Sequence, residues 1–123
     1  MNTTYSIILV RGDIPVRHQV VQVAHAAQES GAAFGCPPEN NLLIFKLGNK
    51  QSLSDWIKHL ETKMRGISFE ETGLVTGKTK FTMTESNQVK QTYETEIMGL
   101  TAWCSEPVSE EFKYLLTQLT LWN

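Results

Sequence analysis

The chain has few of the residues that form disulfide cross-links in small proteins or bind metals. Its 123 residues include two cysteines, Cys36 and Cys104, and three histidines. Two cysteines make neither a disulfide framework nor a zinc-binding set, so we expect a reducing compartment and no metal or other cofactor. The chain is nevertheless long enough to bury one hydrophobic core without disulfides or a bound metal.

Long apolar runs and an excess of charge are also missing. The run over residues 7–10 is four residues long, far too short for a signal-peptide core or a membrane span. We therefore expect a cytoplasmic protein with no membrane partner. The net charge of -2 argues against a general nucleic-acid coat protein, whose affinity comes from many phosphate contacts. A role with RNA would depend on a local basic patch.

Apolar periodicity predicts alternating strands and helices. Apolar, β-branched runs are typical of buried strands, and apolar residues at helical spacing are typical of helices that cover a sheet. In chain order we first expect a strand over 5–10, a helix over 15–33 ended by Gly31 or Gly35, and a strand over 41–47. A helix from an N-cap at Ser52 to Gly66 and a strand over 67–71 should follow. The last two elements are a strand within 93–103, centred on 97–100, and a helix capped by Ser105 or Ser109.

Each expected helix carries an apolar stripe that should face the core. The members, helix by helix, are Val16, Val20, Val23, Ala24 and Ala27; Leu53, Trp56, Ile57, Leu60 and Met64; and Val108, Phe112, Leu115, Leu116 and Leu119.

This order of elements, β-α-β-α-β-β-α, predicts one α/β domain over 1–123. We expect a layered sandwich with a four-stranded mixed sheet and helices packed on it. The first two strands should be parallel, because a helix separates them. Ligands favour the carboxyl ends of parallel strands, here residues 11–13 and 46–49. Residues 72–92 fit either a mobile loop or a hairpin extension around Lys80.

Polar residues that could carry chemistry lie on the first helix. His18, Gln22 and His25 recur at i, i+4 and i+7, so they share one side. The two histidines are about 10 Å apart along the axis, too far to share a metal ion. A solvated helix face is the alternative interpretation, and for His25 alone a buried, hydrogen-bonded histidine is another.

Two further groups of charged residues are candidates. Glu71 at a strand end can act as a general base or orient one, or it can be an ordinary exposed acid. Lys78, Lys80 and Lys90 can form an arm that contacts phosphates, or a solvated loop.

Two segments together resemble a known family. Residues 8–14, ILVRGDI, and 20–27, VVQVAHAA, resemble the type II peptidyl-tRNA hydrolases, in which a strand ending in Arg-x-Asp-Leu precedes a helix with a Val-Ala-Ala-Gln-Cys-Ser-His-Ala-Ala motif. Lys46 falls where the family has a lysine at the end of its second strand. The closing residues 118–122 are similar to the family's His-Leu-Lys-Leu-Tyr end. The similarity spans nearly the whole chain except 72–92.

The resemblance implies an α/β sandwich that cleaves the ester between a peptide and the 3′ ribose of tRNA. His18 stands where the family has a catalytic lysine, Ala24 where it has a serine, and Glu71 where it has an aspartate. The family's threonine falls near Thr95 or Glu96. The resemblance and the residue chemistry together give catalytic candidates His18, Gln22, His25 and Glu71, and tRNA-binding candidates Arg11, Asp13, Lys46, Lys78 and Lys80.

Three functions stay open on these residues. The first is a peptidyl-tRNA hydrolase-type carboxylic ester hydrolase, in which neutral His18 serves as base. The second is an inactive relative that binds RNA or protein, and the third is a small-molecule enzyme that has reused the cleft, because a fold does not settle a function. Residues 72–92 and the apolar closing segment are candidate contacts for a homodimer.

Charge is unevenly distributed along the chain. Residues 1–65 carry 7 basic and 5 acidic side chains, whereas residues 66–123 carry 4 and 8. The half with the recognisable helix therefore keeps a modest positive charge.

Overall fold

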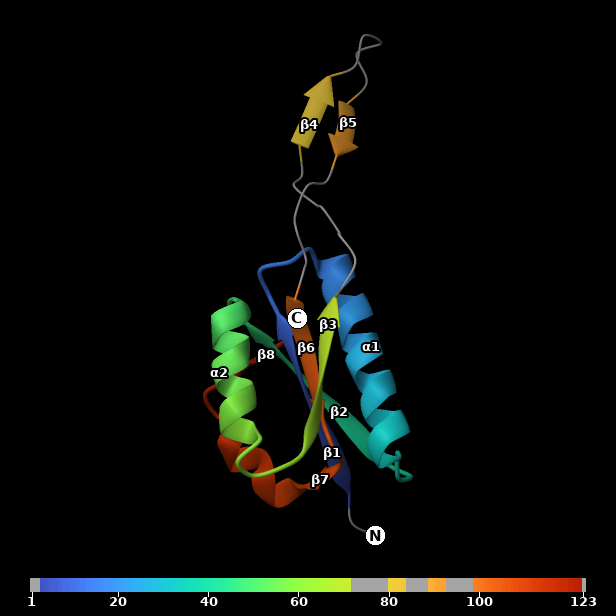
Figure 1. The fold of residues 1–123 in the computed structure, drawn as a ribbon, viewed down its shortest axis with the longest axis vertical. Helices are drawn as coiled ribbons and strands as arrows, with labels where there is room; N and C mark the ends of the chain where they lie inside the picture. Colours follow the sequence, from blue (N-terminus) through green and yellow to red (C-terminus); the bar gives the residue numbers. More distant parts are fainter. Residues whose placement is uncertain (1–2, 72–79, 84–88, 93–98, 123) are drawn as a thin grey trace.

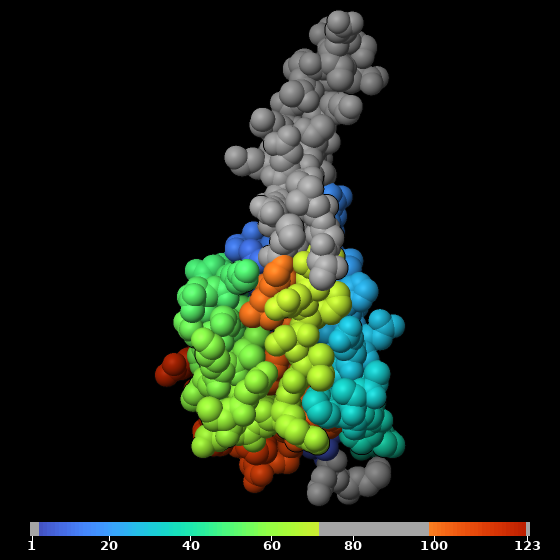
Figure 2. All heavy atoms as spheres, viewed as in Figure 1, coloured from blue at the N-terminus to red at the C-terminus, as the bar shows by residue number. Residues whose placement is uncertain are grey.

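The computed structural model describes residues 3–71 and 99–122 in full, and the backbone of residues 80–83 and 89–92. It is an α/β fold with one helix on each face of a mixed sheet (Figure 1). The expected layers are therefore confirmed. In Figure 2 the edge strand of this sheet, in yellow-green, is visible from outside between the two helices.

The sheet has six strands, so the expectation of four is wrong. The long strands are β1 (Thr4–Arg11), β2 (Asn40–Leu47), β3 (Gly66–Glu71) and β6 (Gly99–Ser105). The two additional strands are β7 (Val108–Ser109) and β8 (Thr120–Leu121). Each of these has only two residues, too few for an alternating pattern to show in the sequence.

The strand order places three carboxyl ends together. The order is β3-β6-β1-β2-β8, and β7 pairs with the start of β1. β1 and β2 are parallel, as predicted, while β6 is antiparallel to both β1 and β3. β1, β2 and β3 therefore run in one direction and end at Arg11, Leu47 and Glu71. We call this end of the sheet the carboxyl edge.

The first helix, α1 (Val16–Phe34), lies where the sequence predicts it but shows a different face to the sheet. It ends at Gly35, whose φ of 78° suits glycine. The expected stripe is wrong at Val16 and Val20, which are 58% and 49% exposed. Ala24 is also exposed, whereas Val23 and Ala27 do pack on the core. The buried residues of α1 are Gln19, Gln22, Ala26 and Ser30.

Hydrogen bonds to the surrounding structure explain this face of α1. The Gln19 amide donates to the carbonyl of Ile14 at 2.7 Å and accepts from Trp122 Nε1 at 2.7 Å. The Ser30 hydroxyl donates to the carbonyl of Ser105 at 2.9 Å. Because each buried polar group has a partner, its burial carries no large desolvation penalty. Hydrophobic periodicity cannot predict such a face.

The second helix, α2 (Lys50–Leu60), buries the stripe that the sequence predicts. Leu53, Ile57 and Leu60 are buried against the sheet. Its start differs from the prediction, because the N-cap is Asn49 and not Ser52. The Asn49 side chain accepts from the backbone N–H of Ser52 at 2.8 Å. The helix also ends at Leu60, and residues 61–64 continue as turn and bend.

This cap gives a first prediction. Asn49→Ala should lower the free energy of unfolding by about 1 kcal/mol, because one amide at the helix start loses its acceptor. Urea denaturation with an unchanged m-value measures the effect. Asn49→Asp keeps an accepting oxygen and is the matched control. Equal loss in both variants would argue against capping as the cause.

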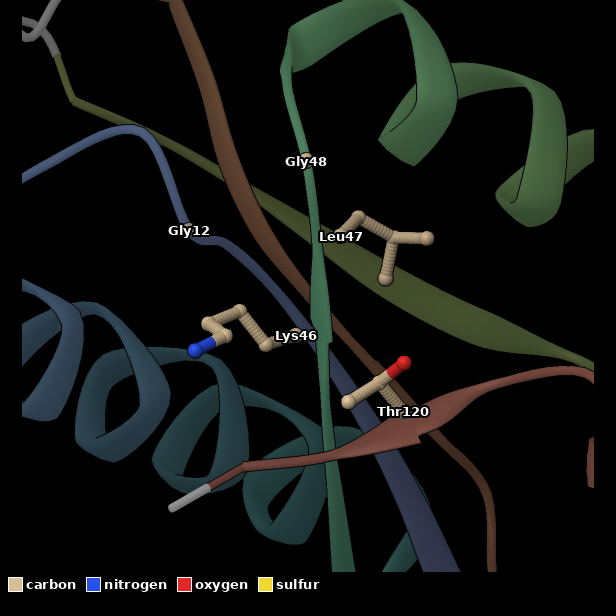
Figure 3. Close-up of a pocket in the computed structure, with 5 residues that line it drawn as sticks. All are labelled: Gly12, Lys46, Leu47, Gly48 and Thr120. Carbon is tan, nitrogen blue, oxygen red and sulfur yellow. The ribbon is translucent and has the colours of Figure 1, made fainter.

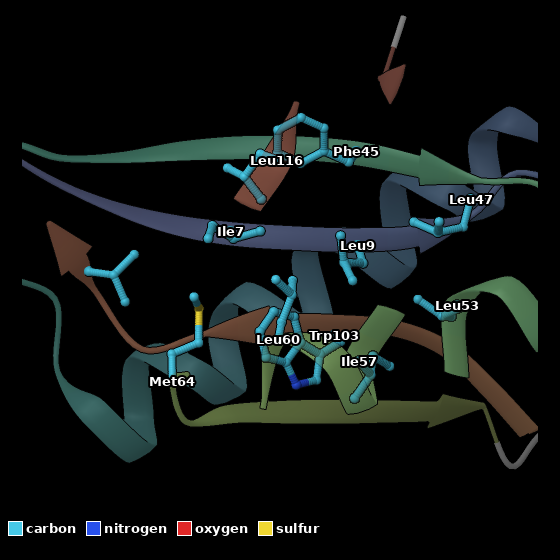
Figure 4. Close-up of a cluster of buried hydrophobic side chains, with 11 residues drawn as sticks. Ile7, Leu9, Phe45, Leu47, Leu53, Ile57, Leu60, Met64, Trp103 and Leu116 are labelled. Atoms are coloured by element: carbon cyan, nitrogen blue, oxygen red, sulfur yellow. The ribbon is translucent and has the colours of Figure 1, made fainter. Parts of the chain in front are cut away.

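Each face of the sheet packs against its own helix, and the two faces form separate hydrophobic cores. One core joins α2 and the 3₁₀ helix η1 (Glu110–Leu116) to the sheet around Trp103 (Figure 4). Val108 and Leu116 are buried in it, and Phe112, Leu115 and Leu119 pack against it, as the third stripe predicts. The other core lies under α1 and includes Ile8, Val10, Ala26, Ala102 and Cys104.

The segment between β3 and β6 contains a hairpin. β4 (Lys80–Met83) pairs antiparallel with β5 (Val89–Thr92) in a separate two-stranded sheet. The hairpin alternative for residues 72–92 is thereby confirmed for these strands. The expected strand within 93–103 begins at Gly99, so its centre lies further along the chain than predicted. Residues 93–98 lie outside the described part of the chain.

Candidate active site

A hydrogen-bonded chain of side chains joins α1 to β3 and β6 at the carboxyl edge. Gln22 Nε2 donates to Glu71 Oε2 at 3.1 Å, although the two residues are 49 positions apart in sequence. The Thr101 hydroxyl donates to Gln22 Oε1 at 2.7 Å. Gln22 is 1% exposed and Thr101 is fully buried. The fold thus brings together two of the residues that the sequence selected, Gln22 and Glu71.

Thr101 is the member of this chain that sequence reasoning missed. It lies in β6 among apolar residues, and a lone threonine in a strand is typical of ordinary β-sheet. The signal that could have revealed Thr101 is the pairing of β3 with β6. This pairing sets Ala102, the next residue after Thr101 in β6, opposite Phe69 of β3. That pairing is a property of the fold and not of a local pattern.

His18 lies one helical turn before Gln22, about 6 Å away along the axis of α1. Its backbone N–H bonds to the carbonyl of Pro15 at 2.9 Å, so it belongs to the first turn of the helix. Its side chain is half-buried, and its imidazole makes no hydrogen bond to any residue that the structure describes. The helix therefore brings His18 close to the carboxyl edge.

His25 has a different environment. It is exposed, and its ring stacks on Phe69 of β3 with centroids 4.7 Å apart and an interplanar angle of 4°. The interpretation of His25 as a buried histidine is therefore wrong. The helix also carries it away from His18 by about 10 Å along the axis. Its contact is with the edge strand.

Arg11 and Asp13, both predicted to bind substrate, bind each other. The guanidinium donates to both carboxylate oxygens, with Nε to Oδ1 at 2.9 Å and Nη2 to Oδ2 at 3.0 Å. Nη1 also approaches the carbonyl of Leu100 at 3.4 Å. The Arg11 side chain is only 11% exposed. This bidentate pair fixes the turn after β1 and places the negative charge of Asp13 directly on the guanidinium of Arg11.

Lys46 lines a hollow of about 250 Å³ between the ends of β1 and β2 (Figure 3). Its side chain extends to the side of the sheet opposite Leu47. A Cβ atom on Gly12 would lie 2.5 Å from Lys46 Cγ, so the lysine stem passes directly over this glycine. The backbone N–H of Gly12 bonds to the carbonyl of Leu47 at 2.6 Å. Glycine at position 12 therefore leaves room for the lysine.

Lys50 is a second cation at this edge, and no pattern in the sequence points to it. Its ammonium lies beside Gly99, where an added Cβ atom would be 2.6 Å from Nζ. Gly99 has a φ of 87° and opens β6 opposite Glu71. Lys46 and Lys50 thus both stand at the carboxyl edge. Of the other predicted cations, Lys78 lies outside the described residues, and Lys80 is placed only by its backbone in β4.

The chemistry of the remaining groups is limited within the described residues. Residues 3–71 and 99–122 contain no group of three or more His, Cys, Asp or Glu side chains arranged to hold a metal ion. Burial raises the pKa of the Cys104 thiol, and a hydrogen bond with Ser30 opposes this only in part. Cys104 is therefore a neutral core residue. Thr95 and Glu96 lie outside the described residues.

The sequence matches no family model and no curated protein. Among the helices that the structure describes, none has the length and apolar character needed to cross a membrane.

Proposed function

We propose that this chain is a peptidyl-tRNA hydrolase-type esterase with its site at the carboxyl edge. The observation that carries the proposal is the hydrogen bond between Gln22 and Glu71. It joins the helix motif to the strand-end acid, the two parts of the sequence in which the family resemblance locates the catalytic groups.

Hydrolysis of an ester needs a positioned water, a group that takes its proton and donors for the developing oxyanion. In this proposal His18 accepts the proton from water, and Glu71 holds that water in place. Gln22 is buried and both ends of its amide are bonded, so it positions Glu71 without touching substrate. His25 supports β3 through its stack on Phe69.

The cations at the carboxyl edge fit the phosphates of a tRNA acceptor end. Lys46 lines an open hollow, and Lys50 lies at the first turn of α2. Arg11 contributes less, because Asp13 already occupies its guanidinium. Because these lysines can contact only a few phosphates, and because the net charge is small, tRNA binding should be weak, and its affinity should fall as the salt concentration rises.

A second candidate, a binding module without hydrolysis, has one observation in its favour. Catalytic bases are usually oriented by a third group, and the His18 imidazole has no such partner among the described residues. In that case the same lysines would bind RNA, and no ester would be cleaved.

The experiment that separates these functions uses the whole protein and an aminoacyl-tRNA blocked at its amino group. Release of free tRNA and binding of the uncleaved substrate are measured at 50 mM and 200 mM salt. Release supports the esterase, and binding without release selects the binding module. Failure to bind at the lower salt would contradict both.

Lys46→Ala gives a further prediction on the same substrate. If Lys46 contacts a phosphate, the slope of log affinity against log salt should become shallower by roughly 1. Lys58→Ala removes an exposed lysine in the last turn of α2 and is the matched control. An unchanged slope for Lys46→Ala would show that Lys46 does not contact a phosphate of the RNA.

A further inference from the structure

The Thr101 hydroxyl lies between two acceptors in the buried interior. It is 2.7 Å from Gln22 Oε1 and 3.3 Å from the carbonyl oxygen of Phe69. A hydroxyl has one hydrogen to donate, and the shorter distance favours Gln22. Thr101 is fully buried, so no water competes for this contact.

The Gln22 amide has two unlike ends, and only one of them suits Glu71. A carboxylate accepts hydrogen bonds and cannot donate them, so the amide nitrogen must face it. A rotated amide would place its oxygen against the carboxylate, with two acceptors facing each other. A donor on the inner side of the amide keeps the oxygen there and the nitrogen at the carboxyl edge. Thr101 supplies that donor.

We infer that Thr101 is a positioning residue, which orients the Gln22 amide and through it fixes the carboxylate of Glu71. The inference rests on the proposed function, because ester hydrolysis is the reaction in which Glu71 would act. The opposing explanation is that Thr101 only fills space in β6, as β-branched residues commonly do.

Two substitutions separate these explanations because they remove different atoms. Thr101→Val keeps the β-branched shape and loses the donor, whereas Thr101→Ser keeps the donor and loses a methyl group. A positioning role predicts that valine is the damaging change. A packing role predicts the reverse, since serine leaves a small cavity where the methyl was.

The first measurement is steady-state hydrolysis of blocked aminoacyl-tRNA by the full chain. Thr101→Val should lower kcat about ten-fold, because a misplaced supporting group weakens the reacting geometry, while KM stays within about two-fold. Thr101→Ser should retain most of the kcat of the wild type. Loss in Thr101→Ser with full kcat in Thr101→Val would overturn the inference.

The second measurement tests whether Thr101 acts through Gln22. Gln22→Met keeps the length of the side chain and removes the amide, so it should lower kcat to a similar extent. Adding Thr101→Val to Gln22→Met should then cause no further loss, since the two residues act as one unit. Additive losses, or full kcat in Gln22→Met, would contradict the inference. Gln22→Met also keeps it falsifiable should Thr101→Val fail to fold.

The third measurement needs no activity. The side-chain NH₂ group of Gln22 gives its own pair of amide signals in an NMR spectrum, and its hydrogen exchange reports how firmly it is held. Thr101→Val should shift these signals and speed their exchange. Unchanged Gln22 signals would overturn the inference even if the wild type proves inactive, whereas an inactive wild type with the expected shift would overturn the proposed function alone.

Discussion

His18→Ala is expected to lower the rate of peptidyl-tRNA hydrolysis by roughly 10²–10⁴-fold, the usual contribution of a general base. His18 lies one helical turn before Gln22 and on the same side of α1, and Gln22 in turn bonds to Glu71. Alanine keeps the helix and removes the imidazole, which in the proposed mechanism takes the proton from water. Single-turnover release of tRNA from a blocked aminoacyl-tRNA measures the chemical step directly.

His59→Ala is the matched control for this result. His59 is exposed near the end of α2, where it packs edge-on against Trp56 with ring centroids 5.6 Å apart. Its removal should leave the hydrolysis rate unchanged. If His18→Ala also turns over at the wild-type rate, His18 does not act as the base, and the mechanism proposed here is wrong.

Gly66→Ala is expected to lower the free energy of unfolding by about 2–3 kcal/mol, the upper part of the range for overpacked cores. Gly66 opens β3, and an added Cβ atom would overlap the indole of Trp103. Trp103 cannot yield easily, because it is fully buried and its Nε1 donates to Glu61 at 2.9 Å. The loss is a large fraction of the 5–15 kcal/mol that typically stabilises a domain. Urea denaturation measures it.

Gly31→Ala makes the same substitution with the opposite expected sign. Gly31 lies inside α1, and an added Cβ atom there would meet nothing within 4 Å. Alanine should raise the free energy of unfolding by about 0.5–1 kcal/mol, because glycine is a poor helix former. Destabilisation by both substitutions would show that the overlap with Trp103 is not the reason for the loss at Gly66.

The regular elements were the most predictable part of this fold. Leu53, Ile57 and Leu60 recur at helical spacing and are all buried, because nothing competes with hydrophobic burial on that face of α2. The same reasoning failed at Val16 and Val20 of α1. There the sheet and the C-terminal segment offer hydrogen-bond partners to Gln19 and Gln22, so the polar face turns inward.

The candidate site could be predicted only in part. His18 and Gln22 were selectable because helical spacing puts them on one side, and Glu71 because it ends a strand. That Arg11 would bind Asp13, and that Lys50 would lie beside Gly99, depends on how turns and strands meet. No local pattern contains those distances.

The helices, the long strands and the parallel pairing of β1 with β2 could be read from local patterns, because periodicity and connection length are local properties. The tertiary structure decided which face of α1 is buried and which groups meet at the carboxyl edge. Thr101 and Glu71 contact Gln22 because β3 pairs with β6 beneath α1. A buried amide can only lie where partners from other strands satisfy it, and those partners exist only in the folded chain.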